Sequence, residues 1–189
     1  MLPSPFNLLP ASALSKQDLT KGTTLFRRND PATAMFYVVS GQLELLRYTG
    51  QGDEVVIHRA LFGETFAEAA VFSDIYHCDA VASETAVVVR ISKESVLDEM
   101  RADSEFAMAI SARFAGQIQN YRRRLEILAI RDAKSRVFAA LADGMLSGSI
   151  KSFAAQIGLT HEAVYRALSA LTRSGRLVKT ARGDFKLPK

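Results

Sequence analysis

Cysteine is almost absent from this 189-residue sequence, which contains Cys78 alone. A single thiol excludes an internal disulfide, a four-cysteine iron–sulfur cluster and the usual zinc spacings within one chain. The three histidines, His58, His77 and His161, are far apart in the sequence. No His-x-His pair, nucleophile elbow or phosphate-binding loop is present. We therefore expect a protein that is not an enzyme and has no dedicated metal site.

Long hydrophobic runs are also missing. No apolar run approaches the roughly 18 residues that a membrane span needs. The first residues, MLPSPFNLLPASALSK, lack the basic region and continuous apolar core of a signal peptide. With 48% hydrophobic and 23% charged residues, the composition is that of an ordinary globular protein. We expect a cytoplasmic protein without a membrane partner.

The net charge of +4 hides an uneven distribution along the chain. Residues 1–100 contain eight Lys and Arg against thirteen Asp and Glu, whereas residues 101–189 contain sixteen against seven. The C-terminal half is therefore basic, and its positive charge suits a phosphate backbone. A solvated helix face is the alternative explanation for a charge run of this kind.

The first hundred residues have the pattern of a β domain, in which turn residues separate short apolar runs. Short runs rich in Val, Leu and Phe alternate with turn residues at 23–28, 35–41, 42–48, 54–62 and 85–92. Many short strands at this spacing predict an antiparallel sandwich or barrel with a hydrophobic interior. The stretch FAEAAVF, residues 66–72, instead predicts one or two helical turns.

From about residue 93 the apolar residues recur with a helical period. Such a pattern predicts a long amphipathic helix, and an apolar stripe of this length requires a partner, for which a parallel second copy of the chain is the simplest choice. Packing onto the chain's own β domain is the alternative. The residues of the predicted dimer stripe are Phe106, Ile110, Phe114, Gln117, Tyr121, Leu125 and Leu128.

Residues 150–169 have the spacing of a helix-turn-helix. Another helix is expected between Asp132 and this motif, and Asp132 is placed to cap its N-terminus. Gly158 falls at the turn, where a residue without Cβ is favoured. Thr160 is placed to cap the second helix. Apolar residues occupy the positions that such a motif buries, namely Phe153, Ile157, Leu159, Val164 and Leu168.

The second helix is predicted to read DNA bases with its exposed face. In a major-groove helix Arg166 can donate two hydrogen bonds to guanine, and Glu162 can accept one from cytosine. A surface ion pair between the two, worth about 0.3–0.5 kcal/mol, is the alternative. The predicted face consists of His161, Glu162, Tyr165, Arg166 and Ser169, with Thr160 before it.

After this helix, GRLVKTARGDFKL (residues 175–187) alternates in two short runs around a turn, which predicts a wing hairpin. Its basic residues are placed to contact phosphates, and such contacts position a protein without specifying sequence. These residues are Arg176, Lys179, Arg182 and Lys186.

This order of elements resembles the CRP/FNR family of bacterial transcription regulators over about residues 21–189. The motifs that carry the resemblance are MFYVVSGQLEL (35–45), GETFAEAAVF (63–72) and HEAVYRAL (161–168). The family usually has Arg-Glu-x-x-x-Arg at the head of the recognition helix; Glu162 and Arg166 match it, whereas His161 replaces the first arginine and Tyr165 replaces a residue that is commonly small.

The resemblance implies an α+β fold in three parts. Residues 1–100 would form an antiparallel β-roll, or double-stranded β-helix, residues 101–130 a dimerisation helix, and residues 131–189 a winged helix-turn-helix. It also implies a homodimer that binds double-stranded DNA at a palindromic operator and contacts RNA polymerase. We expect an effector to bias the packing of the two long helices, and the linker near Asp132 to pass that bias to the recognition helices.

By the same resemblance an effector pocket would include Glu68, His77, Cys78, Asp79 and Tyr121. Glu68 keeps the glutamate that holds the ribose in members that bind cyclic AMP. Cys78 and Asp79 stand where those members have an arginine and a hydroxyl residue for the phosphate, and Tyr121 replaces a small hydroxyl residue near the base. A carboxylate repels a phosphate, so cyclic AMP is disfavoured and the effector is unknown.

Other interpretations stay open for this region. His77 and Cys78 could serve a haem or redox sensor. Adjacent residues on a strand point to opposite faces, so the alternative is that one packs inside and the other faces solvent. A cupin-like metalloenzyme and a protein-binding adaptor are the rivals from other classes. The helix that precedes the β-roll in this family is expected to be shortened to residues 9–19, LPASALSKQDL.

Overall fold

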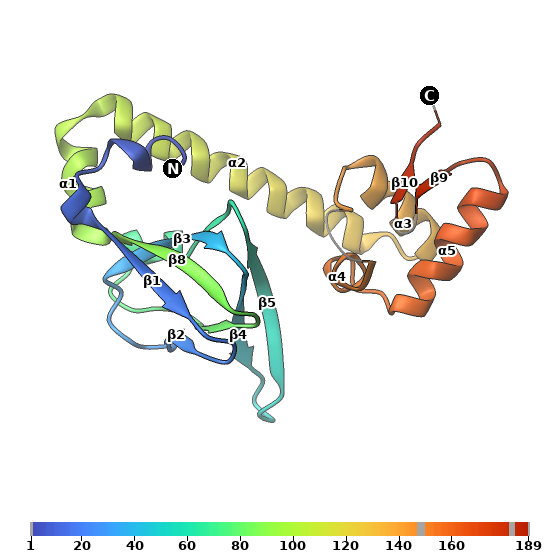
Figure 1. The fold of residues 1–189 in the computed structure, drawn as a ribbon, viewed down its shortest axis with the longest axis horizontal. Coiled ribbons are helices and arrows are strands. Elements are labelled where there is room, and N and C mark those ends of the chain that lie inside the picture. The colour runs from blue at the N-terminus through green and yellow to red at the C-terminus, as the bar shows by residue number, and fades with distance from the viewer. Residues whose placement is uncertain (1, 147–149, 182–183, 189) are drawn as a thin grey trace. The chain divides into compact units, whose positions relative to one another are not determined.

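The structure is a computed structural model that describes residues 2–146, 150–181 and 184–188. The chain divides into two compact units, Met1–Ala112 and Arg113–Lys189, and the boundary falls inside the long helix α2, Ser104–Ala129 (Figure 1). None of the described helices is long and apolar enough to cross a membrane.

Two four-stranded antiparallel sheets form the first unit. One has the strand order β1-β8-β3-β6, and the other has the order β2-β7-β4-β5. The strands are β1 (Leu14–Leu19), β2 (Thr24–Phe26), β3 (Ala34–Ser40), β4 (Gln42–Tyr48), β5 (Glu54–Leu61), β6 (Thr65–Phe66), β7 (Asp79–Ala82) and β8 (Ala86–Ser92). Short helices complete the unit, namely η1 (Phe6–Leu8), η2 (Ala11–Ala13), η3 (Glu68–Phe72) and α1 (Lys93–Ala102).

The predicted β domain is confirmed, including its five predicted strands and the helical turns in residues 66–72. The helix expected at residues 9–19 is wrong, because only η2 is helical there and Leu14–Leu19 form β1, which pairs with β8. Strand β1 lies at the edge of its sheet and contains Ser, Lys, Gln and Asp. Polar residues are common on edge strands, where they obscure the alternation that identifies a strand.

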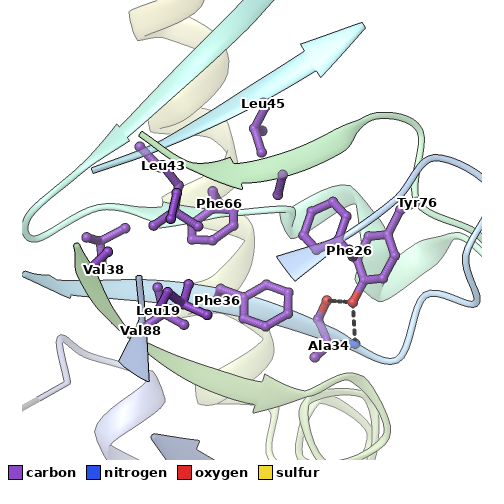
Figure 2. Packing of buried hydrophobic residues seen from close by; sticks show 14 of the residues in the cluster. Leu19, Phe26, Ala34, Phe36, Val38, Leu43, Leu45, Phe66, Tyr76 and Val88 are labelled. Atoms are coloured by element: carbon purple, nitrogen blue, oxygen red, sulfur yellow. Dashed lines mark hydrogen bonds between the residues drawn. The ribbon is translucent and has the colours of Figure 1, made fainter. Parts of the chain in front are cut away.

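Side chains from both sheets form the core of the first unit, which Figure 2 shows. The rings of Phe26 and Tyr76 stack with centroids 3.8 Å apart, and those of Phe36 and Phe66 are 5.3 Å apart. The Tyr76 hydroxyl donates to the Ala34 carbonyl at 2.8 Å and accepts from the Ala34 N–H at 3.2 Å. The one polar end of this aromatic cluster is therefore satisfied by the backbone of β3.

Gly41 lies in the tight turn between β3 and β4, with a φ of 76°. A Cβ atom at this position would lie 2.7 Å from the Ala86 Cα atom, closer than real Cβ atoms approach. The turn therefore requires glycine for two reasons, its left-handed backbone and its contact with β8.

The second unit contains the C-terminal part of α2, three further helices and a hairpin. These elements are α3 (Ala133–Ala142), α4 (Ile150–Gln156), α5 (His161–Arg173), β9 (Val178–Ala181) and β10 (Asp184–Lys186). Helices α3 and α4 both pack against α5. Strands β9 and β10 pair antiparallel, as the predicted wing requires. The core includes Val137, Phe153, Ile157, Val164 and Leu168.

Candidate nucleic-acid interface

Helix α5 begins where the sequence predicts. Thr160 is its N-cap, and the Thr160 Oγ1 atom accepts a hydrogen bond from the Ala163 N–H at 3.2 Å. Gly158 precedes it with a φ of 62°, a left-handed conformation that ends α4 and lets the chain turn into α5. The buried face of α5 consists of Val164, Ala167, Leu168 and Leu171. Because this face is anchored in the core, the opposite face is held rigidly toward solvent.

The exposed face of α5 carries all five residues predicted on it, namely His161, Glu162, Tyr165, Arg166 and Ser169. The rings of His161 and Tyr165 meet edge to face, with centroids 4.5 Å apart. This contact joins the first two turns of the helix and leaves Tyr165 47% exposed. The face therefore combines hydrogen-bond donors, an acceptor and an aromatic surface, a mixture suited to base edges and thymine methyl groups.

Glu162 lies in the first turn of α5, and its carboxylate has a lowered pKa. The main cause is hydrogen bonding to its own backbone N–H, followed by the Thr160 hydroxyl, with smaller contributions from His161 and Arg166. A negative side chain at this position also interacts favourably with the positive end of the helix dipole. Glu162 thus carries its negative charge at the N-terminal end of α5.

The basic residues near the hairpin have different surroundings. The guanidinium of Arg176 lies 3.9 Å from the centre of the Phe138 ring, on which it stacks. Lys179 and Lys186 are exposed on β9 and β10. Arg182 lies outside the described residues. Arg176 is therefore held in place by an aromatic contact, whereas the two lysines are exposed to solvent.

The predicted dimer stripe on α2 divides into buried and exposed parts. Phe106 and Ile110 are 1% and 0% exposed within the single chain, so their prediction as dimer contacts is corrected: both pack inside the first unit. Phe114, Gln117 and Leu128 are half-buried. Tyr121 and Leu125 remain 48% and 65% exposed.

Ile118 was missing from the predicted stripe, yet it is 51% exposed. Ile118, Tyr121 and Leu125 follow one another at steps of three and four, so they lie on one face of α2. The apolar surface left for a partner is thus rotated from the predicted one. The sequence does place the apolar Ile118 near the stripe, one position away from the strict repeat. The repeat was aligned on Phe106 and Ile110, and this alignment left Ile118 out.

The predicted effector residues of the first unit each have their own partners or surroundings. Glu68 accepts a 2.6 Å hydrogen bond from the Thr65 hydroxyl, and the Asp79 carboxylate accepts a 2.7 Å bond from the Arg28 N–H. Cys78 is half-buried against the core, whereas His77 is exposed and bonded to Ser73 at 3.1 Å. Tyr121 belongs to the other unit.

A cyclic nucleotide stays disfavoured at these residues. Cys78 packs against the aromatic core and the Asp79 carboxylate accepts from the Arg28 N–H, so neither side chain offers a cation to a phosphate. A hollow of about 390 Å³ lies elsewhere, and none of the predicted effector residues lines it. It is lined by Leu2, Leu14, Ser15, Lys16, Tyr37, Val39, Phe62 and Val89.

Haem does not fit His77 and Cys78 either, because one side chain faces solvent and the other packs against the core. Burial raises the pKa of the Cys78 thiol, the charge of Asp79 raises it further, and Arg47 lowers it. The thiol is therefore protonated at neutral pH and a weak ligand or nucleophile. Within the described part of the chain, no three His, Cys, Asp or Glu residues gather as a possible metal site.

Comparison with known proteins relates this chain to bacterial regulators. Residues 16–103 match the family described as "Cyclic nucleotide-binding domain". The Fumarate and nitrate reduction regulatory protein of Salmonella typhi is 25% identical, over 86% of this chain and 70% of that protein.

Two solved structures share the fold. FixK2 from Bradyrhizobium japonicum has a TM-score of 0.70 at 22% identity, over 93% of each chain. The c-di-GMP responsive global regulator CLP from Xanthomonas campestris has a TM-score of 0.63 at 21% identity, over 94% of this chain and 95% of that one. Both comparisons span the two units, so the likeness extends through the whole order of elements.

Proposed function

Since this chain belongs to the CRP/FNR family of transcription regulators, we propose that it binds a palindromic operator as a homodimer and reads bases with α5. The observation that carries this proposal is the exposed face of α5, where Glu162 and Arg166 lie one turn apart on a helix fixed by Thr160. Two such helices on a dimer enter successive major grooves about 34 Å apart on one side of the DNA.

The distribution of charge supports the same proposal. The second unit has the basic part of the sequence, and Lys179 and Lys186 are exposed beside α5 in the chain. These lysines contact phosphates and contribute affinity without sequence preference. Arg176 adds a third cation whose direction is set by Phe138.

The dimer is proposed to form through the exposed apolar face of α2. Ile118, Tyr121 and Leu125 supply this face, and residues 101–130 form the dimerisation segment between a sensory region, residues 1–100, and a DNA-binding region, residues 131–189. A stripe of this kind is stabilised by a parallel copy of itself. The dimer would act in the bacterial cytoplasm, where the chromosome and RNA polymerase are both accessible.

The proposed regulator responds to an effector other than cyclic AMP. This follows from the residues at the predicted phosphate position, where Cys78 and Asp79 provide a neutral thiol and a carboxylate. The relatives are transcription regulators, and no catalytic step is assigned to this chain.

Selection of DNA from a random pool tests the proposal, followed by titration of the selected site and of unrelated DNA. We expect Arg166→Ala to weaken binding to the selected site by about 1–3 kcal/mol and to leave unrelated DNA nearly unaffected. Arg101→Ala, which removes a surface arginine from α1, is the matched control and should leave both affinities unchanged. Equal losses on both DNAs would reduce Arg166 to a phosphate contact, and no selected sequence at all would contradict base reading by α5.

A further inference from the structure

Arg136, in the first turn of α3, joins two segments that border the recognition helix. Its Nε atom donates to the Ile130 carbonyl at 2.8 Å, at the end of α2. Its Nη1 atom donates to the Ile157 carbonyl at 3.2 Å and lies 3.4 Å from the Gly158 carbonyl, both in the turn before α5. One guanidinium therefore contacts both the linker that leaves α2 and the turn that enters α5.

The chemistry of arginine suits this bridge. The last carbonyls of a helix have no partner within the helix, and the carbonyls of Ile157 and Gly158 follow the end of α4. A cation at this end also interacts favourably with the helix dipole. The planar guanidinium offers several donors in a fixed arrangement, so it can contact two separate segments without losing orientation.

The end of α2 is held in the second unit by other contacts as well. Arg123 forms an ion pair with Asp143, at the end of α3. Ile127 is 5% exposed and belongs to the core that includes Val137. The linker between α2 and α3 is also held in place, because Asp132 accepts from the Ser135 N–H at 2.7 Å and caps α3. The last turns of α2, the linker and α3 therefore form one packed assembly.

We propose that Arg136 is a positioning residue that couples the end of α2 to the start of α5. A displacement of Ile130 moves the guanidinium, and the guanidinium holds the carbonyls that set the direction in which α5 begins. The expected effect of Arg136 on DNA affinity rests on the proposed function. The coupling between α2 and α5 is a property of the free protein and does not depend on it. The linker near Asp132 thus transmits motion through a side chain in addition to its backbone.

The test compares full-length wild type with Arg136→Ala, Arg136→Lys and the control Lys134→Ala, which removes an exposed cation from the same helix. Hydrogen–deuterium exchange of the free protein is followed in peptides that cover residues 128–133 and 157–164. We expect Arg136→Ala to accelerate exchange in both peptides, Arg136→Lys to restore part of the protection, and Lys134→Ala to match wild type.

Binding to the selected DNA site is measured at a temperature where all four proteins are folded. We expect Arg136→Ala to weaken specific binding about tenfold, equivalent to the loss of one charge-assisted hydrogen bond, and to leave binding to unrelated DNA unchanged. A simple loss of stability would not separate the two affinities below the melting temperature. Partial recovery of specific binding by Arg136→Lys supports positioning.

Three outcomes would overturn the proposal: unchanged exchange in Arg136→Ala, exchange accelerated throughout the second unit, or accelerated exchange with unchanged specific binding. If wild type selects no DNA while exchange rises in the two peptides alone, the proposed function fails and the coupling stands. The two ideas can therefore fail separately.

Discussion

At the scale of single residues, the start of α5 shows how one side chain satisfies a free N–H group of a helix. Thr160 accepts from the Ala163 N–H, and the pKa of the neighbouring Glu162 carboxylate is lowered, chiefly by its own backbone N–H and then by the Thr160 hydroxyl. The first N–H groups of any helix lack partners within it. Here the residue that caps the helix also stands beside the predicted base-reading face, so stability and recognition depend on neighbouring atoms.

Replacement of Thr160 by Ala is expected to reduce the free energy of unfolding of the second unit by about 1 kcal/mol, because an N-cap hydrogen bond is lost. Urea denaturation followed by circular dichroism measures the change. Ser169→Ala removes an exposed hydroxyl from the middle of the same helix and should change stability little. Equal destabilisation by both substitutions would argue against a capping role for Thr160.

Tyr76→Phe is expected to destabilise the first unit by about 1–2 kcal/mol, since the Ala34 N–H and carbonyl lose the hydroxyl that pairs with them. Burial raises the pKa of Tyr76. Wild type should therefore lose stability as the pH rises through 10 toward the folded pKa, because only the unfolded chain ionises readily there.

Denaturation curves at neutral and alkaline pH test both statements about Tyr76. The Phe variant should lose less stability than wild type above pH 10, as it has no hydroxyl to ionise. Tyr48→Phe, at a tyrosine that is 53% exposed, is the control and should behave like wild type. A Tyr76→Phe protein as stable as wild type at neutral pH would show that the two hydrogen bonds contribute nothing net.

Cys78 is expected to react with iodoacetamide more slowly than a free thiol at neutral pH. Its pKa is raised by burial and by Asp79, so little thiolate is present. Asp79→Asn should speed the reaction, because it removes the neighbouring negative charge while the amide oxygen can still accept from the Arg28 N–H. Reaction as fast as a model thiol in wild type would restore a thiol-based sensor as a serious alternative.

At the scale of elements, the sequence predicts most where one period dominates. The strands with a clear alternation and the capped helices α3 and α5 are confirmed, since their patterns reflect one buried and one exposed face. Strands β1, β6 and β7 of the first unit are not predicted in this way. The first is polar at a sheet edge, and the other two contain two and four residues, too few for a clear pattern.

Helix α2 shows why part of the candidate site was missed. Its N-terminal turns bury Phe106 and Ile110 in one unit, and its C-terminal turns bury Ile127 in the other. A single apolar repeat along the helix cannot separate these buried residues from the exposed ones, so the prediction assigned both kinds to one dimer stripe. The bridge made by Arg136 could not be predicted at all, because its partners are backbone carbonyls, which leave no trace in residue type.

Leu125→Glu is expected to shift the protein from dimer toward monomer, since it places a charge in the exposed stripe of α2. Sedimentation velocity over a range of concentrations measures the shift. Glu126→Gln, at a neighbouring exposed position off the stripe, serves as the control and should leave the dimer intact. A Leu125→Glu protein that remains fully dimeric would place the interface elsewhere.

Phe106→Ala, at a buried position of the same helix, should instead destabilise the folded chain by about 3–5 kcal/mol.

At the scale of the whole molecule, the two parts of the sequence have opposite charge, acidic in residues 1–100 and basic in residues 101–189. The acidic part is expected to repel DNA and the basic part to attract it. Association with DNA should therefore orient the chain before any base is read. Overall charge, fold and family can be derived from the sequence, but the effector cannot, because its contacts depend on which side chains face a common space.

Helix α2 is continuous over Ser104–Ala129, so its exposed apolar stripe has a phase as well as a length. Each added residue would turn every later side chain by about 100° around the helix axis, whereas seven added residues restore nearly the same face. Insertions within the stripe, between Ile118 and Leu125, should therefore be accepted in whole multiples of this repeat. In terms of descent, the helix could lengthen only in steps that keep its partner-facing side continuous.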